Sequence, residues 1–421
     1  MTKGDISQGA EIAAQGGLIA ATDGLSVSAG RDLINRADLV SGGDIDLYAG
    51  RDLNLAAVQD VRGEDFTRGY RRSSSVEQQA SRVTSARDIH LAAGRDIDIV
   101  ASRVDARNDL SALAGRDLRV RSAADVHNNE HHYRSSRTRK DVVDTHTRQQ
   151  GSELSAGGDL SLIAGNDLTA QASRLKAGDQ AYLVGGNDVA LVAANDEDYH
   201  YYYKKKKSGG MISRKSMKRD EVTDTRAVGT TVETGGDLTI VSGGDQTYEA
   251  ARLDSGENLS LTSGGGITFA GALDTRTESH DKSKSNWAWQ SAKGKGQTDQ
   301  TLRQSELLAQ GQTLIQAANG LNIDVSHIDQ QTVSQTIDAM VTADPDLAWL
   351  KTMEDRGDVD WRAVKEIHDS WDYSQSGLGQ GAALAISIAA TAMMPGIGAG
   401  LSGAMMTAGA GSLAATGAVS L

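Results

Sequence analysis

The stretch GGDIDLYAGRDLNLAA at residues 42–57 contains two short apolar alternations, each introduced by a Gly-x-Asp corner. Aliphatic residues occupy every second position, so Ile45, Leu47, Leu53 and Leu55 fall on one side of an extended chain. Glycine recurs every eight residues, and the 3.6-residue period of a helix is missing. The stretch therefore predicts two short β-strands separated by a tight corner.

The same doublet recurs along the chain. Its copies are ARDIHLAAGRDIDIVAS, RNDLSALAGRDLRVRSA, GGDLSLIAGNDLTAQAS, GDQAYLVGGNDVALVAA, GGDLTIVSGGDQTYEAA and ENLSLTSGGGITFAG. Consecutive doublets are 21 residues apart, as from Asp88 to Asp109, and a third short segment such as ASRVDAR (101–107) completes each unit. We therefore expect an all-β fold, a right-handed parallel β-helix with 21-residue coils and three strands per coil. Like residues should stack about 4.8 Å apart over nine or ten coils, which occupy residues 1–330.

Four polar insertions interrupt the repeat, one in every second coil, and each enters after the second strand of its coil or early in the third. They cover residues 58–79, 122–150, 195–231 and 275–304. Two coils occupy about 9.6 Å of the helix axis, which is the width of two paired strands. We therefore expect each insertion to be a β-hairpin extruded from one edge, with neighbouring hairpins joined in one sheet.

The corner aspartates raise the question of calcium binding. Each corner carries one carboxylate and the step is eight residues, whereas calcium-binding solenoids have a nine-residue pattern with more carboxylates. The pattern favours turn chemistry: the Asp or Asn side chain bonds its own turn backbone, and glycine adopts positive φ. We expect no metal, no cofactor and no catalytic residue in the repeats.

Composition and charge exclude several classes of protein. The chain has 56 acidic and 43 basic residues and a net charge of −13, so its overall field repels nucleic acid, and we expect no nucleic-acid partner. Cysteine is absent, which excludes disulfides and thiolate metal sites. The first residues lack the basic and apolar regions of a signal peptide, which favours an excerpt of a longer chain.

The insertions hold the residues that most resemble a contact site. Tyr201 and Tyr203 lie in DYHYYYKKKK, and Trp287 and Trp289 alternate in SNWAWQ, where they would touch a glycan or a protein partner or pack on the β-helix. Three histidines, His127, His131 and His132, cluster in HNNEHHY, but no matching ligand elsewhere completes a metal site.

Residues 331–421 have a different character. Asp344 precedes Pro345 as a cap, and Leu347, Leu350 and Met353 follow at helical spacing, which predicts helix up to about residue 373. Residues 382–394 then read as an apolar helix, followed by a Gly/Ala-rich tail. We expect a helical, truncated domain, in which residues 377–421 are either a buried helical hairpin or a membrane-active segment.

The GGDLxLxAGxDL doublets and the serine-rich charged insertions resemble the haemagglutinin repeats of filamentous haemagglutinins and contact-dependent growth inhibition effectors (CdiA-like proteins). Residues from 331 resemble the start of the haemagglutinin-associated domain of unknown function. This resemblance implies secretion through an outer-membrane two-partner transporter, display on the bacterial cell surface, and adhesion or toxin delivery. It implies contact with a target-cell receptor or glycan, or with the target-cell membrane. A β-helical polysaccharide-processing enzyme is the alternative.

Overall fold

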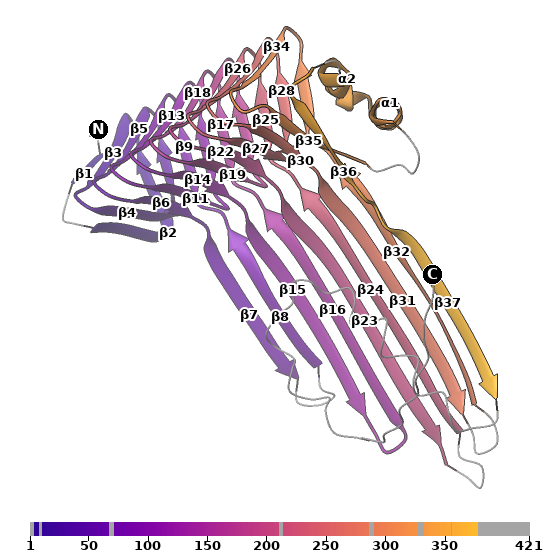
Figure 1. The fold of residues 1–421 in the computed structure, drawn as a ribbon. Coiled ribbons are helices and arrows are strands. Elements are labelled where there is room, and N and C mark those ends of the chain that lie inside the picture. Colours follow the sequence, from indigo (N-terminus) through magenta and orange to yellow (C-terminus); the bar gives the residue numbers. More distant parts are fainter. Residues whose placement is uncertain are drawn as a thin grey trace.

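The structure is a computed structural model that describes residues 4–7, 11–66, 71–209, 214–285, 290–326, 332–354 and 356–377. Its main body is a parallel β-helix, seen in Figure 1 as a stack of coils. The first side of the stack is a ten-stranded parallel sheet, one strand per coil. Its strands are β1 (Gly4–Ser7), β3 (Gly24–Ala29), β5 (Asp44–Ala49), β10 (Ile89–Ala93), β13 (Leu110–Ala114), β18 (Leu160–Ala164), β21 (Ala181–Gly185), β26 (Leu238–Ser242), β29 (Leu259–Ser263) and β34 (Thr313–Ala317).

The other two sides form one 18-stranded sheet with two rows, which the long strands β2 (Glu11–Ala21) and β4 (Asp32–Ser41) join. The second row contains β6 (Leu53–Ala56), β11 (Ile97–Val100), β14 (Leu118–Arg121), β19 (Leu168–Gln171), β22 (Val189–Val192), β27 (Gln246–Glu249), β30 (Ile267–Ala270), β35 (Leu321–Ser326) and β36 (Val359–Val364). The third row contains β9 (Arg82–Ser85), β12 (Arg103–Ala106), β17 (Glu153–Ala156), β20 (Arg174–Ala177), β25 (Thr231–Thr234), β28 (Arg252–Ser255) and β33 (Glu306–Ala309). The three-strand coil that the repeat predicts is confirmed.

The core consists of equivalent aliphatic residues stacked from coil to coil. Ile45 pairs with Ile89 and Ile89 with Leu110, and all three side chains are buried. This stacking follows from the alternation, because a strand with apolar residues at every second position has one face to bury. The few aromatic residues of the core gather at the C-terminal end, where the rings of Tyr248 and Phe269 stack with centroids 5.1 Å apart.

The corner glycines are required by close packing between coils, so the expectation of positive φ at these corners is wrong. A Cβ atom on Gly165 would lie 2.3 Å from the carbonyl oxygen of Gly115 in the preceding coil. The same contact recurs from Gly115 to Gly94 and from Gly94 to Gly50. Among the described glycines, positive φ occurs at Gly16, Gly17 and Gly320, which are not these corners. The repeat therefore needs glycine because the backbone of the neighbouring coil fills the space of a side chain.

The four insertions supply eight strands of one antiparallel sheet, and β37 (His368–Gly377) adds the ninth. This sheet, named here the hairpin sheet, extends away from one edge of the β-helix (Figure 1). Its hairpins are β7 (Val58–Phe66) with β8 (Arg71–Gln79), β15 (Ala123–Arg134) with β16 (Thr138–Gln150), β23 (Ala194–Ser208) with β24 (Arg214–Val228), and β31 (Ala272–Ser285) with β32 (Gln290–Arg303). Each hairpin pairs with the next, as β16 does with β23 and β24 with β31. The predicted hairpins and their joining in one sheet are confirmed.

In the coils that carry no hairpin, the chain turns from the second strand to the third at a single alanine. Ala101, Ala172 and Ala250 have φ of 44°, 44° and 46°, in the left-handed region that disfavours a side chain. All three are buried. The hairpins leave the β-helix at this same corner, so the alternation of coils places successive hairpins two coils apart.

Two short helices close the C-terminal end of the β-helix. The helix α1 (Val333–Ala343) begins at a capping box between Thr332 and Gln335. The predicted cap at Asp344 opens the 3-10 turn η1 (Pro345–Leu347), which leads into α2 (Trp349–Glu354). The Trp349 ring lies 4.8 Å from that of Phe269, and its indole N–H donates to the Ser305 carbonyl at 3.1 Å. The helices thus bury the end of the core, as terminal caps of solenoids do.

The expectation of helix beyond α2 is wrong for residues 359–377. Residues 359–364 form β36, which pairs with β35, and β37 (His368–Gly377) pairs with β32 at the edge of the hairpin sheet. Each of these strands pairs with an edge strand and so satisfies the backbone donors and acceptors that the edge would otherwise leave open. This pairing outweighs the helical spacing of the local sequence. The predicted apolar helix at 382–394 lies outside the described residues. Within the described part, no helix has the length and hydrophobicity needed to cross a membrane.

Candidate functional site

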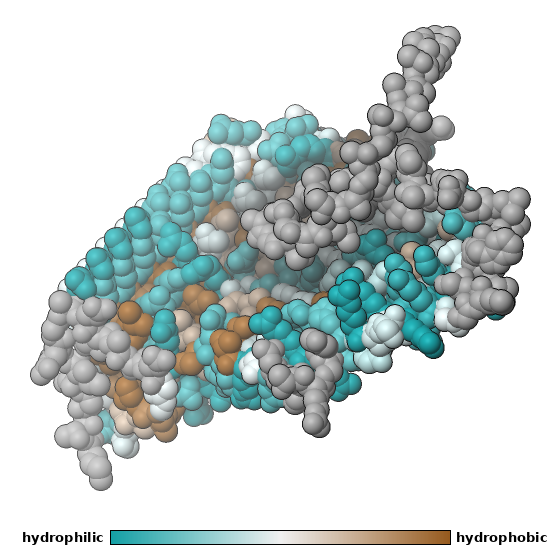
Figure 2. All heavy atoms as spheres, turned by 90° about the horizontal axis from the view of Figure 1, so that it is seen from below, coloured by the Kyte–Doolittle hydropathy of each residue, from teal (hydrophilic) through white to brown (hydrophobic). Residues whose placement is uncertain are grey.

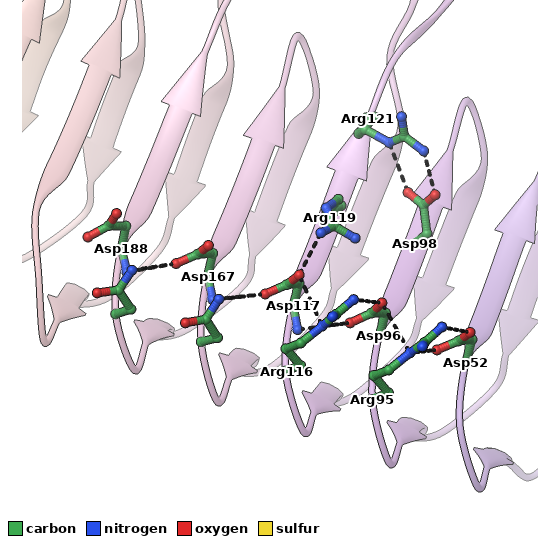
Figure 3. Close-up of polar contacts among 12 residues, drawn as sticks. Asp52, Arg95, Asp96, Asp98, Arg116, Asp117, Arg119, Arg121, Asp167 and Asp188 are labelled. Atoms are coloured by element: carbon green, nitrogen blue, oxygen red, sulfur yellow. Dashed lines mark hydrogen bonds and ion pairs between the residues drawn. The ribbon is translucent and has the colours of Figure 1, made fainter.

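The corner aspartates form ladders along the β-helix (Figure 3). The Oδ1 atom of Asp167 accepts the backbone N–H of Asp188 at 3.2 Å, and Oδ1 of Asp188 accepts that of Asp245 at 2.8 Å. A parallel ladder at the other corner joins Asp88 to Asp109 at 3.2 Å. The prediction that each aspartate bonds its own turn is therefore wrong, because its acceptor is used by the next coil.

At this corner, basic or amide side chains from the next coil also bind the aspartates from Asp52 to Asp167. Arg95 donates to Asp52 at 2.7 Å and Arg116 to Asp96 at 2.8 Å, and Asn166 takes the same place beside Asp117 at 2.9 Å. Burial is the largest single influence on Asp96 and would raise its pKa, but the hydrogen bonds from Arg116 and from the Asp117 backbone N–H, together with the charges of the neighbouring arginines, outweigh burial, and the pKa is lowered. These carboxylates hold the coils together, and they are occupied by protein donors.

No cation site is formed by the described residues, since no group of three or more His, Asp or Glu side chains there has the geometry to hold a metal. The three clustered histidines do not converge. Neighbouring positions on a strand face opposite ways, so His131 and His132 lie on opposite faces of the hairpin sheet. His132 instead contacts Asp141 at 3.1 Å and Glu130 at 3.4 Å.

Neighbouring hairpins are joined by cross-strand contacts of histidine or arginine with aspartate. His146 and Arg148 of β16 both contact Asp198 of β23, at 2.6 and 2.7 Å. The hydrogen bonds from Arg148 and His146 lower the pKa of Asp198. His280 of β31 contacts Asp220 of β24 at 3.0 Å in the same way. These pairs join different hairpins, so they fix the hairpin sheet as one surface.

Tyr201 and Tyr203 lie side by side on one face of β23, and both are half-buried. The Arg219 guanidinium lies 5.7 Å from the Tyr201 ring centroid, and that of Arg139 lies 5.5 Å from the Tyr203 ring. Burial raises the pKa of Tyr201, so the phenol is neutral at physiological pH. Both rings therefore carry an intramolecular cation–π contact, and their role in partner contact stays a prediction.

The sequence-predicted residues Trp287 and Trp289 lie outside the described residues. A different aromatic pair, Trp371 and Tyr373, lies on β37 with ring centroids 6.0 Å apart. A Cβ on Gly296 would lie 2.4 Å from the Trp371 ring, and one on Gly294 would lie 2.4 Å from the Tyr373 ring. Gly294 and Gly296 therefore leave space for the two aromatic rings on the neighbouring strand. The sequence alone does not connect these glycines with Trp371 and Tyr373, because the pairing of β32 with β37 is needed to do so.

The comparisons with known proteins agree with this geometry. A family model described as hemagglutinin repeat matches residues 65–138, 133–285 and 208–344, and a second haemagglutinin repeat model matches residues 3–64. No solved structure matches the chain.

Three curated relatives are large proteins. The chain is 27% identical to the tRNA nuclease CdiA of Escherichia coli over 62% of its length, and 29% identical to the deoxyribonuclease CdiA of Dickeya dadantii over 64%. It is 28% identical to the 16S rRNA endonuclease CdiA of Enterobacter cloacae over 34%. The chain spans less than a tenth of the length of these relatives. The matches cover 8% of the Escherichia coli protein, 8% of the Dickeya dadantii protein and 4% of the Enterobacter cloacae protein.

The repeat period, the corner ladders and the extruded hairpins are therefore those of a known repeat class, whose members are secreted and displayed on the bacterial cell surface. The chain belongs to the haemagglutinin-repeat family and is a repeat segment of the filamentous haemagglutinin and CdiA type.

Proposed function

We propose that this segment is a rigid spacer within a large secreted filamentous protein, where it carries an adhesive or toxin-bearing part away from the producing cell. The single observation that carries the proposal is the unbroken ten-stranded sheet, in which each strand is hydrogen-bonded through its backbone to the strand of the next coil. A solenoid of this kind has an axial length set by its number of coils. Length and stiffness are the properties that a spacer needs.

The hairpin sheet is the part that makes contact with the target cell in this proposal. It stands away from the β-helix (Figure 1). The strand register places polar, charged and aromatic residues at fixed positions on its two faces. A receptor or a glycan of the target cell would bind such a surface. Export through an outer-membrane two-partner transporter fits the proposal, because parallel coils stack one after another as the chain emerges.

A catalytic role has less support. Glycoside-processing β-helices need two carboxylates or a cluster of basic and acidic groups around one bond. The repeated carboxylates of this chain accept hydrogen bonds from the neighbouring coil, so they are engaged in stabilising the stack. Incubation with a panel of acidic glycans tests this alternative, and turnover of any of them would overturn the spacer proposal.

The proposal is tested by shortening the β-helix in register within the full filamentous protein. Deletion of residues 88–158 removes two coils and one hairpin and joins Arg87 to Asp159, which occupies the same corner as Asp88. The filament should shorten by about 9.6 Å and retain display and target-cell attachment.

A matched deletion of residues 88–147, which ends inside β16, breaks the register and should abolish display. Loss of attachment in the in-register variant, with display intact, would contradict a role as spacer. A second candidate, membrane activity of residues 377–421, is addressed by liposome leakage with and without that tail.

A further inference from the structure

The far end of the hairpin sheet concentrates positive charge. The described residues 133–140, 204–209, 214–218, 282–285, 290–293 and 374–377 are named here the basic rim. They contain fourteen Lys and Arg and no Asp or Glu: Arg134, Arg137, Arg139, Lys140, Lys204, Lys205, Lys206, Lys207, Arg214, Lys215, Lys218, Lys282, Lys284 and Lys293. The whole chain has a net charge of −13, so the basic rim is a cationic region within an acidic protein.

Five of these lysines form one row across five strands. In the strand register Lys140 pairs with Lys204, Lys204 with Lys218, Lys218 with Lys282, and Lys282 with Lys293. Neighbouring strands are about 4.8 Å apart, so the row places like charges directly opposite each other, which destabilises a sheet. A row of this kind is a cost to folding that a bound anion would relieve.

Little inside the described protein neutralises the rim. Only Arg139 and Lys218 have a carboxylate partner among the described residues, Asp141 and Asp220 respectively. Lys140 and Lys218 also flank the Tyr202 ring at 5.6 and 5.2 Å. Closer to the β-helix the pattern reverses, and the cations of the sheet are paired with aspartates such as Asp198 and Asp224.

The rim also contains a hollow of about 810 Å³ lined by six cations and several hydroxyls. The cations are Arg137, Lys206, Lys207, Arg214, Lys215 and Lys284, and none of the described residues that line the hollow is a carboxylate. Figure 2 shows that the far part of the sheet is hydrophilic where its atoms are described. A hollow with this lining is suited to phosphate-bearing headgroups, which lysine binds as a point charge.

The cations occupy both faces of the sheet as well as its end. Lys205, Lys207 and Lys215 lie on one face, whereas the five-lysine row lies on the opposite face. A linear polyanion would lie along a groove on one face. Charge that surrounds the end of a sheet from both faces is better matched to end-on contact with a planar anionic surface.

We propose that the basic rim docks the hairpin sheet onto a lipid surface rich in phosphate headgroups. Each lysine near an anionic bilayer strengthens binding by about five-fold at low ionic strength. The inference rests on the proposed function, in which the hairpin sheet makes the target-cell contact. It names the chemistry of that contact.

The test uses the full chain and co-sedimentation with vesicles of equimolar phosphatidylcholine and phosphatidylglycerol. Wild-type protein should bind these vesicles, should fail to bind pure phosphatidylcholine, and should be released at 1 M salt, where the screening length falls to about 3 Å. A variant with glutamine at the five row positions, K140Q, K204Q, K218Q, K282Q and K293Q, should bind at least about 100-fold more weakly.

The matched control removes five exposed cations from outside the rim: R36Q, R82Q, R107Q, K176Q and K365Q. It has the same net charge as the row variant and should bind within about two-fold of wild type. Circular dichroism checks that both variants fold. Equal losses in the two variants, or an unchanged row variant, would overturn the proposal.

Competition separates the possible sources of the anion. If soluble inositol hexaphosphate or a sulfated polysaccharide binds in a row-dependent manner while vesicles do not, the rim recognises a free polyanion and the lipid proposal is wrong. If vesicle binding persists but the in-register deletion variant fails to attach to target cells, the proposed spacer function is contradicted and the lipid proposal is not. The two proposals are therefore distinguishable.

Discussion

Substitution of Gly165 by alanine tests the packing between coils most sharply. The added Cβ would lie 2.3 Å from the Gly115 carbonyl oxygen, whereas ordinary contacts begin at 3.4 Å. The two coils must separate locally by about 1 Å to relieve the clash. That movement would stretch the hydrogen bond from the Gly165 N–H to the Ala114 carbonyl, now 3.0 Å, beyond hydrogen-bonding distance.

The magnitude follows from the two costs. Overpacking costs about 1–3 kcal/mol, and the lost backbone hydrogen bond adds about 0.5–1.5 kcal/mol. We therefore expect the free energy of unfolding to fall by about 3 kcal/mol in urea titrations followed by far-UV circular dichroism.

Gly357 provides the matched control, because an added Cβ there meets no atom within 4 Å and its φ is not positive. Gly357→Ala should leave stability unchanged or raise it by up to about 1 kcal/mol. Equal stability of Gly165→Ala and Gly357→Ala would refute the claim that coil contact selects glycine at the corners.

Three further perturbations test other parts of the structure. Leu162→Ala should cost about 2–5 kcal/mol because the side chain is fully buried, whereas Ser161→Ala on the outer face should change stability by less than about 0.5 kcal/mol, both measured by urea unfolding. Trp349→Ala should cost about 3–5 kcal/mol and raise tryptic cleavage near the C-terminal coils, since the ring covers the end of the core. The hydrogen bond with Asp299 raises the pKa of His368, so this pair stabilises β37 fully below about pH 6.5 and less as pH rises through the raised pKa. Amide exchange of β37, corrected for intrinsic rates, should therefore accelerate over that window in wild type and show no such step in His368→Gln.

The repeat architecture could be predicted from the sequence because its signals are local and periodic. A 21-residue step between Asp88 and Asp109, with apolar residues at every second position, leaves few folds that bury one face of each strand. The hairpins followed from geometry, since two coils have the width of two strands. Both predictions used spacing along the chain and no knowledge of which coils touch.

The errors arose where the deciding contact lies between coils. Glycine and aspartate at the corners fit a turn equally well, and only the stacked structure shows that Gly165 faces the Gly115 carbonyl and that Asp167 accepts from Asp188. The strands β36 and β37 were missed because their partners, β35 and β32, are edge strands that lie earlier in the chain. The local sequence carries no signal of this pairing.

The basic rim could not be read from the sequence for the same reason. Its lysines are scattered over residues 140–293, and only the strand register aligns them in one row. The candidate contacts at Tyr201 and Tyr203 were found from composition alone, and the structure adds the arginines that cover them.

The central claim, that hairpins from alternate coils form one sheet, is tested most directly by disulfide cross-linking in this cysteine-free chain. Thr225 of β24 and Thr275 of β31 belong to different hairpins and are directly paired, so their Cα atoms should be about 4.5–5.5 Å apart. A T225C/T275C variant should form an intramolecular disulfide under mild oxidation, while T225C/E278C, displaced by three positions, should not. Equal cross-linking in both variants, or none in the first, would contradict the account.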